Sequence, residues 1–201
     1  VKFCVLGQFS QNAASEKPIL IVTTWAGMQS ALSNSAWMQT YVEDGGNLLV
    51  VPSVRPGRMI VSGKFPSWLG ASIKARETYA RGIGLEVLNE TTNFWNRIRE
   101  ATGNSKLESV SAYMFHPLAL SSEFEPLLGV DFQKVVVAHR KMGKGNIFVS
   151  GTAFTSRWNT LPSSGLFVMI AQRMAVTGSS SEQEGILSLV AGERPRGISA
   201  Q

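Results

Sequence analysis

In the stretch Gly143-Lys144-Gly145-Asn146-Ile147-Phe148-Val149-Ser150-Gly151, a glycine turn precedes a short apolar run. A polar segment, Arg157-Trp158-Asn159-Thr160-Leu161-Pro162, and a second apolar run at 166–176 follow it. This order predicts a turn, a buried strand, a loop and a buried helix, which together form the last crossover of an α/β sheet. Because the glycines stand between two expected strands, at 134–140 and 146–150, we predict an antiparallel hairpin and not a phosphate-binding loop.

Two further apolar runs, at 18–24 and 47–52, predict central strands of the sheet. Unbroken runs without alternation are typical of parallel strands that are covered on both faces. A helix between them begins at Asn34 or Ser35 and ends at Gly45-Gly46, because glycine accepts the left-handed backbone of a helix C-terminus. We therefore predict an α/β fold with a mostly parallel sheet and an antiparallel hairpin near its C-terminal part.

The remaining segments are less regular. Strands are expected at 1–6 and 110–115, and a short helix at 94–101. Loops are expected at Gly82-Ile83-Gly84 and around Pro126. Residues 1–178 then form one α/β domain, and 179–201, rich in Gly, Ser, Glu and Arg, predict a linker or the start of a neighbouring domain.

Composition limits the classes of function. The 201 residues, 44% apolar and 16% charged, fit one globular domain. The net charge is +5, but the basic residues are scattered, so we expect no nucleic-acid partner. The single cysteine, Cys4, excludes an intramolecular disulfide. No apolar run approaches the ~20 residues of a membrane span, and because the chain begins at Val1 we expect it to be part of a longer protein.

The sequence offers no catalytic centre. Cys4 lies inside an expected strand and not on the sharp turn that exposes a nucleophile, and no serine lies in a Gly-x-Ser-x-Gly context. His116 and His139 lack neighbouring ligands at the spacing that a metal site needs. We therefore predict no catalytic residue, no metal and no cofactor. Trp158, between Arg157 and Asn159, is the tryptophan that we expect to be partly exposed.

Four segments carry a resemblance to a known family. They are the helix–Gly–Gly–strand unit at 37–50, the segment from Phe94-Trp95 to Gly103, the turn Gly143-Lys144-Gly145, and the element at 157–162 before an apolar helix. Together they resemble the class I glutamine amidotransferase-like domain of BatA-type (aerotolerance) bacterial membrane proteins, which also carry von Willebrand A domains. The matching segments run from about residue 18 to 178.

This resemblance implies a flavodoxin-like three-layer sandwich on the periplasmic side of the bacterial inner membrane. It implies attachment to the membrane only through segments outside these residues. A protein partner is also implied, such as a von Willebrand A domain of the same protein. The resemblance does not imply a catalytic triad. Class I glutamine amidotransferases use a cysteine on a sharp strand-to-helix turn with a downstream histidine and glutamate, and no position here matches that motif.

Two functions follow as expectations. The favoured one is a non-catalytic extracytoplasmic interaction or scaffold domain of a larger membrane-anchored protein. The alternative is an enzyme that acts on a small polar substrate at the carboxyl ends of the strands, where open α/β sheets bind ligands. A deep polar cleft there would favour the enzyme, and a site plugged by a tryptophan would argue against it. The candidate ligand or partner contacts are Trp25, Ser53, Thr155, Arg157, Trp158 and Asn159.

Overall fold

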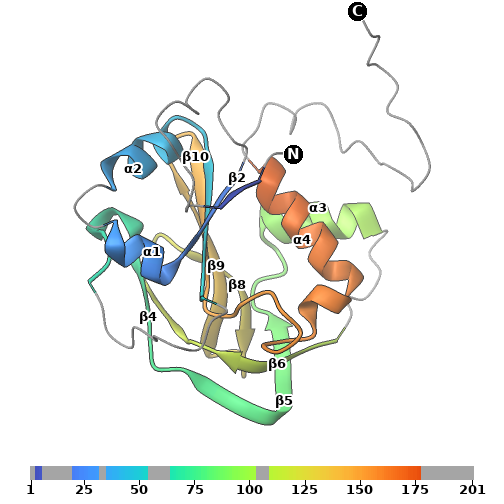
Figure 1. Cartoon of the computed structure of the whole chain (residues 1–201). Helices are drawn as coiled ribbons and strands as arrows, with labels where there is room; N and C mark the ends of the chain where they lie inside the picture. The colour runs from blue at the N-terminus through green and yellow to red at the C-terminus, as the bar shows by residue number, and fades with distance from the viewer. Residues whose placement is uncertain (1–2, 6–19, 32–34, 54–63, 103–108, 178–201) are drawn as a thin grey trace, which may run out of the picture.

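The computed structural model describes residues 3–5, 20–31, 35–53, 64–102 and 109–177 (Figure 1). The elements are β1 (Phe3–Val5), β2 (Leu20–Thr24), α1 (Trp25–Ser30), α2 (Ala36–Glu43), β3 (Asn47–Val51), η3 (Ser67–Leu69), β4 (Ala71–Ile73), β5 (Glu77–Val87), α3 (Asn93–Thr102), β6 (Val110–Phe115), β7 (Leu118–Leu120), β8 (Glu125–Val130), β9 (Lys134–Met142), β10 (Gly145–Ser150), η4 (Leu161–Ser163) and α4 (Gly165–Val176). The segment 179–201, with its predicted linker, lies outside the described residues. Within the described part of the chain, no helix has the length and apolar character that crossing a membrane requires.

Eight strands form one sheet in the order β1-β2-β3-β10-β9-β8-β5-β6, and β4 pairs with β7 in a small second sheet. The pairings β1–β2, β2–β3 and β3–β10 are parallel. The other four, from β10–β9 to β5–β6, are antiparallel. The α/β class is therefore right, but the prediction of a mostly parallel, flavodoxin-like sheet is wrong. The strands β8, β9 and β10 follow one another through short turns, which only antiparallel neighbours allow.

The predicted hairpin is confirmed. Strands β9 and β10 pair from Met142↔Gly145 onward, which leaves Gly143 and Lys144 as a two-residue turn. Gly143 has φ +58°, in the left-handed region that this kind of turn requires. A Cβ on Gly145 would lie 2.1 Å from the carbonyl oxygen of Gly46, so the hairpin packs closely against the turn that ends α2.

Helices cover both faces of the sheet, with α1 and α2 on one side and α3 and α4 on the other (Figure 1). Ile21, Leu48 and Ile147 belong to the hydrophobic core that includes α1 and α2. Leu49 and Phe148 belong to the core that includes α3 and α4. Because successive strand residues alternate between two buried faces, the apolar runs of the sequence are unbroken.

Three local predictions are corrected in whole or in part. Ser35 is the N-cap residue of α2, as predicted, but its hydroxyl accepts a hydrogen bond from Trp68 Nε1 (3.1 Å) and makes no capping hydrogen bond to the helix backbone. The segment Gly82-Ile83-Gly84 is not a loop: it lies in β5, with Gly82 (φ +72°) at an irregularity in the pairing with β6. Pro126 lies in β8, next to a register shift with β9, where a strand tolerates a residue without an N–H donor.

Candidate functional site

The carboxyl ends of β2, β3 and β10 lie side by side, which is where an open α/β sheet places a ligand. Helix α1 starts directly after β2, and the Thr24 hydroxyl caps it by accepting from the N–H of Gly27 (3.0 Å). Trp25, the first residue of α1, is 2% exposed. Its indole Nε1 donates to the carbonyl oxygen of Ser150, at the end of β10, at 2.8 Å. Its ring also meets Phe65 edge-on, with the centroids 5.0 Å apart. A tryptophan therefore fills this end of the sheet.

Asn159 organises the loop that follows β10. The side chain is fully buried, and its Nδ2 donates to Thr152 Oγ1 and to the carbonyl oxygen of Ala153, both at 2.8 Å. Its Oδ1 accepts from the N–H of Leu161 at 3.1 Å. With three hydrogen bonds the buried amide is well satisfied. These hydrogen bonds indicate that Asn159 fixes the backbone path of the loop.

The expectation that Trp158 is partly exposed is wrong, because its side chain is 5% exposed. The reason is a long-range backbone contact: its carbonyl oxygen accepts from the N–H groups of Tyr113 (2.7 Å) and Met114 (3.0 Å) on β6. The loop thus folds back along the outer edge of β6, and the indole lies beside the His116 ring, with the centroids 6.0 Å apart. Within the segment 157–159, Trp158 and Asn159 therefore hold the loop against the rest of the domain.

The other candidate residues lie at or near the surface. Arg157 and Ser53 are exposed. Thr155 is half-buried, and its Oγ1 has no hydrogen-bond partner among the described residues. The structure thus joins Trp25 to the end of β10 and Asn159 to the loop after it, whereas Arg157 stands out from the anchored loop into solvent.

The two histidines lie in separate surroundings. Burial lowers the pKa of His116 below its usual value, and its Nδ1 donates to the carbonyl oxygen of Lys74 at 2.8 Å. His139 lies over Phe148, with ring centroids 4.8 Å apart, and its Nε2 is 2.9 Å from Asn146 Oδ1. No group of three or more His, Cys, Asp or Glu residues that could hold a metal ion occurs in the described ranges.

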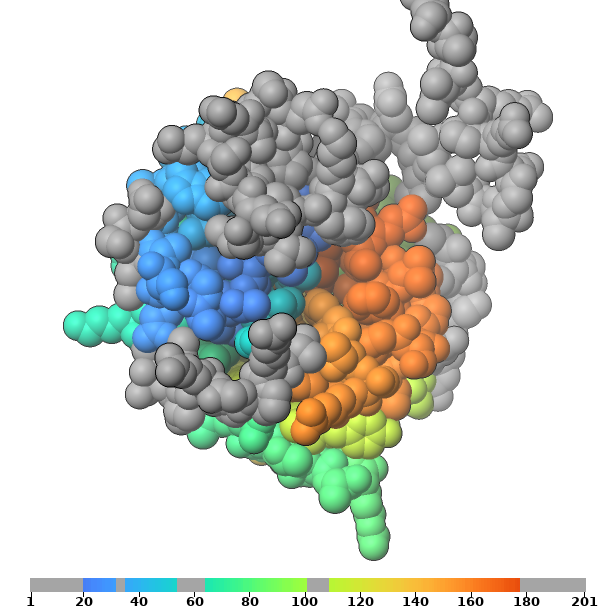
Figure 2. Space-filling model, viewed as in Figure 1, coloured from blue at the N-terminus to red at the C-terminus, as the bar shows by residue number. Residues whose placement is uncertain are grey.

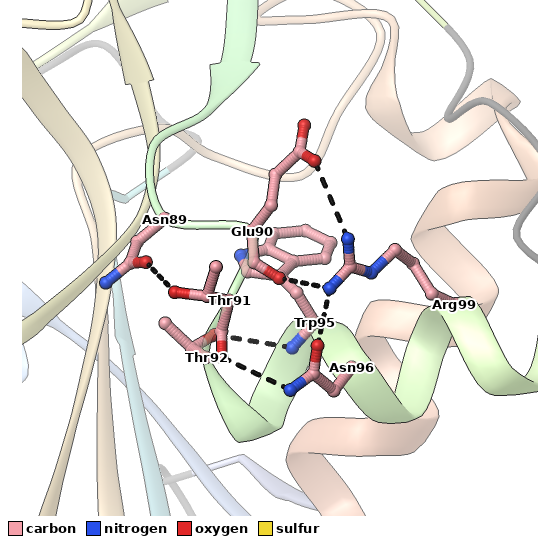
Figure 3. Close-up of polar contacts among 7 residues, drawn as sticks. All are labelled: Asn89, Glu90, Thr91, Thr92, Trp95, Asn96 and Arg99. Atoms are coloured by element: carbon pink, nitrogen blue, oxygen red, sulfur yellow. Dashed lines mark hydrogen bonds and ion pairs between the residues drawn. The ribbon is translucent and has the colours of Figure 1, made fainter.

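Sequence reasoning missed a polar cluster at the start of α3 (Figure 3). Thr92 Oγ1 accepts from the N–H of Trp95 (3.4 Å), which is the pattern of a helix N-cap. The Arg99 guanidinium donates to the carbonyl oxygen of Glu90 (2.8 Å) and to Asn96 Oδ1 (2.5 Å), and it lies 3.7 Å from the Glu90 carboxylate. These contacts hold the buried Trp95 in the core, so we assign the cluster a structural role. The available signal was a threonine at the start of a helical pattern.

No protein-family model matches this chain, and no curated protein matches it in sequence. Solved structures do resemble it. The cytoplasmic protein STM3548 from Salmonella typhimurium has a TM-score of 0.63 at 11% identity, with 84% of this chain and 75% of that one covered. The cytoplasmic protein STM1381 from Salmonella typhimurium LT2 has a TM-score of 0.58 at 12% identity, with 84% and 74% covered. The mmIFT52 N-terminal domain has a TM-score of 0.57 at 15% identity, with 86% and 82% covered.

At such low identity these likenesses concern the fold alone. They agree with the coarser part of the resemblance drawn from the sequence: the chain has a class I glutamine amidotransferase-like fold.

Proposed function

We propose that this chain is a non-catalytic interaction or scaffold domain. The observation that carries the proposal is the position of Trp25. Its buried indole, bonded to the carbonyl of Ser150, occupies the end of the sheet where this fold class would receive a small substrate. An enzyme acting on a small polar substrate at this end, the alternative, would first have to move a tryptophan out of the core.

The family resemblance supports a finer proposal about the setting. By analogy with BatA-type proteins, the domain belongs to a larger membrane-anchored protein and lies on the periplasmic side of the bacterial inner membrane. Its partner is another domain of the same protein, such as a von Willebrand A domain.

Arg157 is the residue best placed to contact that partner. It is exposed, while the two residues after it are buried and bonded to the body of the domain. A side chain presented by an ordered loop loses little conformational entropy on binding, and arginine is enriched among the residues that dominate interfaces. The rigid loop therefore supports a contact role for Arg157, in which Trp158 and Asn159 hold the loop and do not touch the partner.

The test uses the full 201-residue chain and the von Willebrand A domain of the same gene product, with binding measured by calorimetry. We expect Arg157→Ala to weaken binding by about tenfold or more. Lys144→Ala, at the exposed β9–β10 turn, is the matched control and should bind as the wild type does. Equal affinity of Arg157→Ala and the wild type would remove the loop from the interface. Absence of binding by the wild-type chain would refute the proposed partner.

A further inference from the structure

Strand β5 is longer than the neighbours that pair with it. It pairs with β8 only at Glu86 and Val87, and with β6 on its other edge at Glu77–Thr78 and Ile83–Leu85, with an irregularity between Thr78 and Ile83. Between Thr78 and Gly84 no backbone hydrogen bond within the described residues reaches the edge of β5 that faces away from β6. Figure 1 shows β5 at the lower end of the molecule, and Figure 2 shows the green residues of this region projecting there into solvent. An unpaired edge of this kind is a template for another strand.

The exposed charge around this edge is net positive. Arg81 lies in β5 and Lys74 and Arg76 lie just before it, against one exposed carboxylate, that of Asp131 next to Phe132. Lys74, Arg76 and Arg81 are exposed, and none of them forms an ion pair with another described residue. The nearby Glu77 does not neutralise them, because its carboxylate already lies 2.7 Å from Lys134 Nζ.

An exposed aromatic residue stands next to the edge. Phe132, at the tip of the β8–β9 hairpin, is 72% exposed and has φ +53°, a conformation that is strained for a bulky side chain. The pairing of Gly129 with Glu86 and the ion pair between Lys134 and Glu77 hold this tip beside β5. A strained, exposed phenylalanine at a fixed position is costly to the isolated fold, and it points to a use in recognition.

We propose that this β5 edge surface, formed by Thr78–Gly84 with Lys74, Arg76, Arg81 and Phe132, binds an extended acidic segment of a partner protein by strand addition. The backbone of β5 supplies the main-chain hydrogen bonds, the three cations attract carboxylates, and Phe132 covers an apolar side chain of the added strand. Two copies of this chain would bring like charges together at the edge, which disfavours self-pairing. Thr78–Gly84 and Phe132 lie across β6 from the Arg157 loop, whereas Lys74 lies nearer to it, because its carbonyl oxygen accepts from His116, whose ring is beside Trp158.

The test is a fluorescence anisotropy titration of the 201-residue protein with a labelled ten-residue peptide that alternates Glu and Val. We expect saturable binding that Arg81→Glu weakens by about tenfold or more. The matched control is Lys141→Glu, an exposed cation near the opposite end of β9 from Lys134, and it should bind as the wild type does. A peptide with proline at alternate positions should not bind, because it lacks the donors that strand addition needs.

Phe132→Gly separates recognition from folding. Glycine accepts φ +53°, so this variant should melt at the same temperature as the wild type or higher, yet bind the peptide several-fold more weakly. The proposal is overturned if the acidic peptide does not bind, if Arg81→Glu or Phe132→Gly binds like the wild type, or if the proline peptide binds equally well. Tighter, Arg81-dependent binding of a ten-nucleotide thymidine strand would also overturn it, in favour of a nucleic-acid surface.

Discussion

Replacing Asn159 tests whether the loop after β10 is a structural clamp. In Asn159→Ala, three buried hydrogen bonds disappear, to Thr152 Oγ1, to the Ala153 carbonyl and from the Leu161 N–H. A typical intramolecular hydrogen bond contributes about 1 kcal/mol, and the abandoned groups stay buried, so we expect a loss of about 3 kcal/mol in the free energy of unfolding. For a domain of this size each kcal/mol lowers the melting temperature by roughly 2–4 °C, which gives a decrease of roughly 6–12 °C.

The assay is thermal and urea unfolding followed by circular dichroism. Arg157→Ala, two positions earlier but exposed, is the control and should change the stability by less than about 0.5 kcal/mol. Asn159→Asp keeps the size of the side chain but replaces the donor with an oxygen that faces the Ala153 carbonyl, so it should destabilise at least as much as Asn159→Ala. If Asn159→Ala and Arg157→Ala unfold at the same temperature, the three hydrogen bonds of Asn159 do not stabilise the loop and the reasoning is refuted.

Three further predictions concern the same end of the molecule. Trp25→Phe keeps an aromatic ring but removes its hydrogen bond to the β10 carbonyl, and urea unfolding should show a loss of about 1–2 kcal/mol. Gly151→Ala places a Cβ 1.9 Å from the backbone oxygen of His116 and should cost more than about 3 kcal/mol, whereas Gly84→Ala, with no atom nearer than 4.0 Å, should unfold like the wild type. Burial lowers the pKa of His116 in the folded state, so the unfolded chain binds more protons on acidification and stability should fall as the pH drops below about 6.5. In urea titrations from about pH 7.5 to 5, His116→Gln should lose part of that pH dependence, and an unchanged slope would contradict this account.

The central strands could be predicted from the sequence because an unbroken apolar run indicates a strand that is buried on both faces. Leu48, Leu49 and Val50 are all buried, on alternate faces, and the sequence shows an unbroken apolar run. Such a run does not report strand direction. Strand β9 also buries consecutive residues, Val136, Val137 and Ala138, yet it pairs antiparallel with both neighbours. Two-sided burial, the parallel pairing of β2 with β3 and the β9–β10 hairpin were therefore inferred correctly. The extension of parallel pairing to most of the sheet was wrong, because β8, β5 and β6 pair antiparallel.

The local errors share a physical cause, which is contact between residues distant in the chain. Trp158 lies between two polar residues, and its burial depends on bonds to Tyr113 and Met114 on another strand. Gly82 is typical of a turn by composition, but it lies in β5 at the irregular pairing with β6, where a strand admits a left-handed residue. A window of neighbouring residues contains neither partner, so propensity alone favours a loop at both places.

The positions of Trp25 and Asn159 bear on where function resides in this chain. In an open α/β sheet the carboxyl ends of parallel strands usually remain free for a ligand, because backbone and side-chain groups converge there. Here the same groups bond to one another: the Ser150 carbonyl to Trp25 and the Thr152 hydroxyl to Asn159. A ligand at this end would have to replace these internal hydrogen bonds, and breaking them costs stability in the absence of the ligand. Recognition at Arg157 or along the edge of β5 requires no such exchange, since the side chains there are exposed before any partner arrives. This difference in cost is the physical reason to look for the function of the chain on its surface.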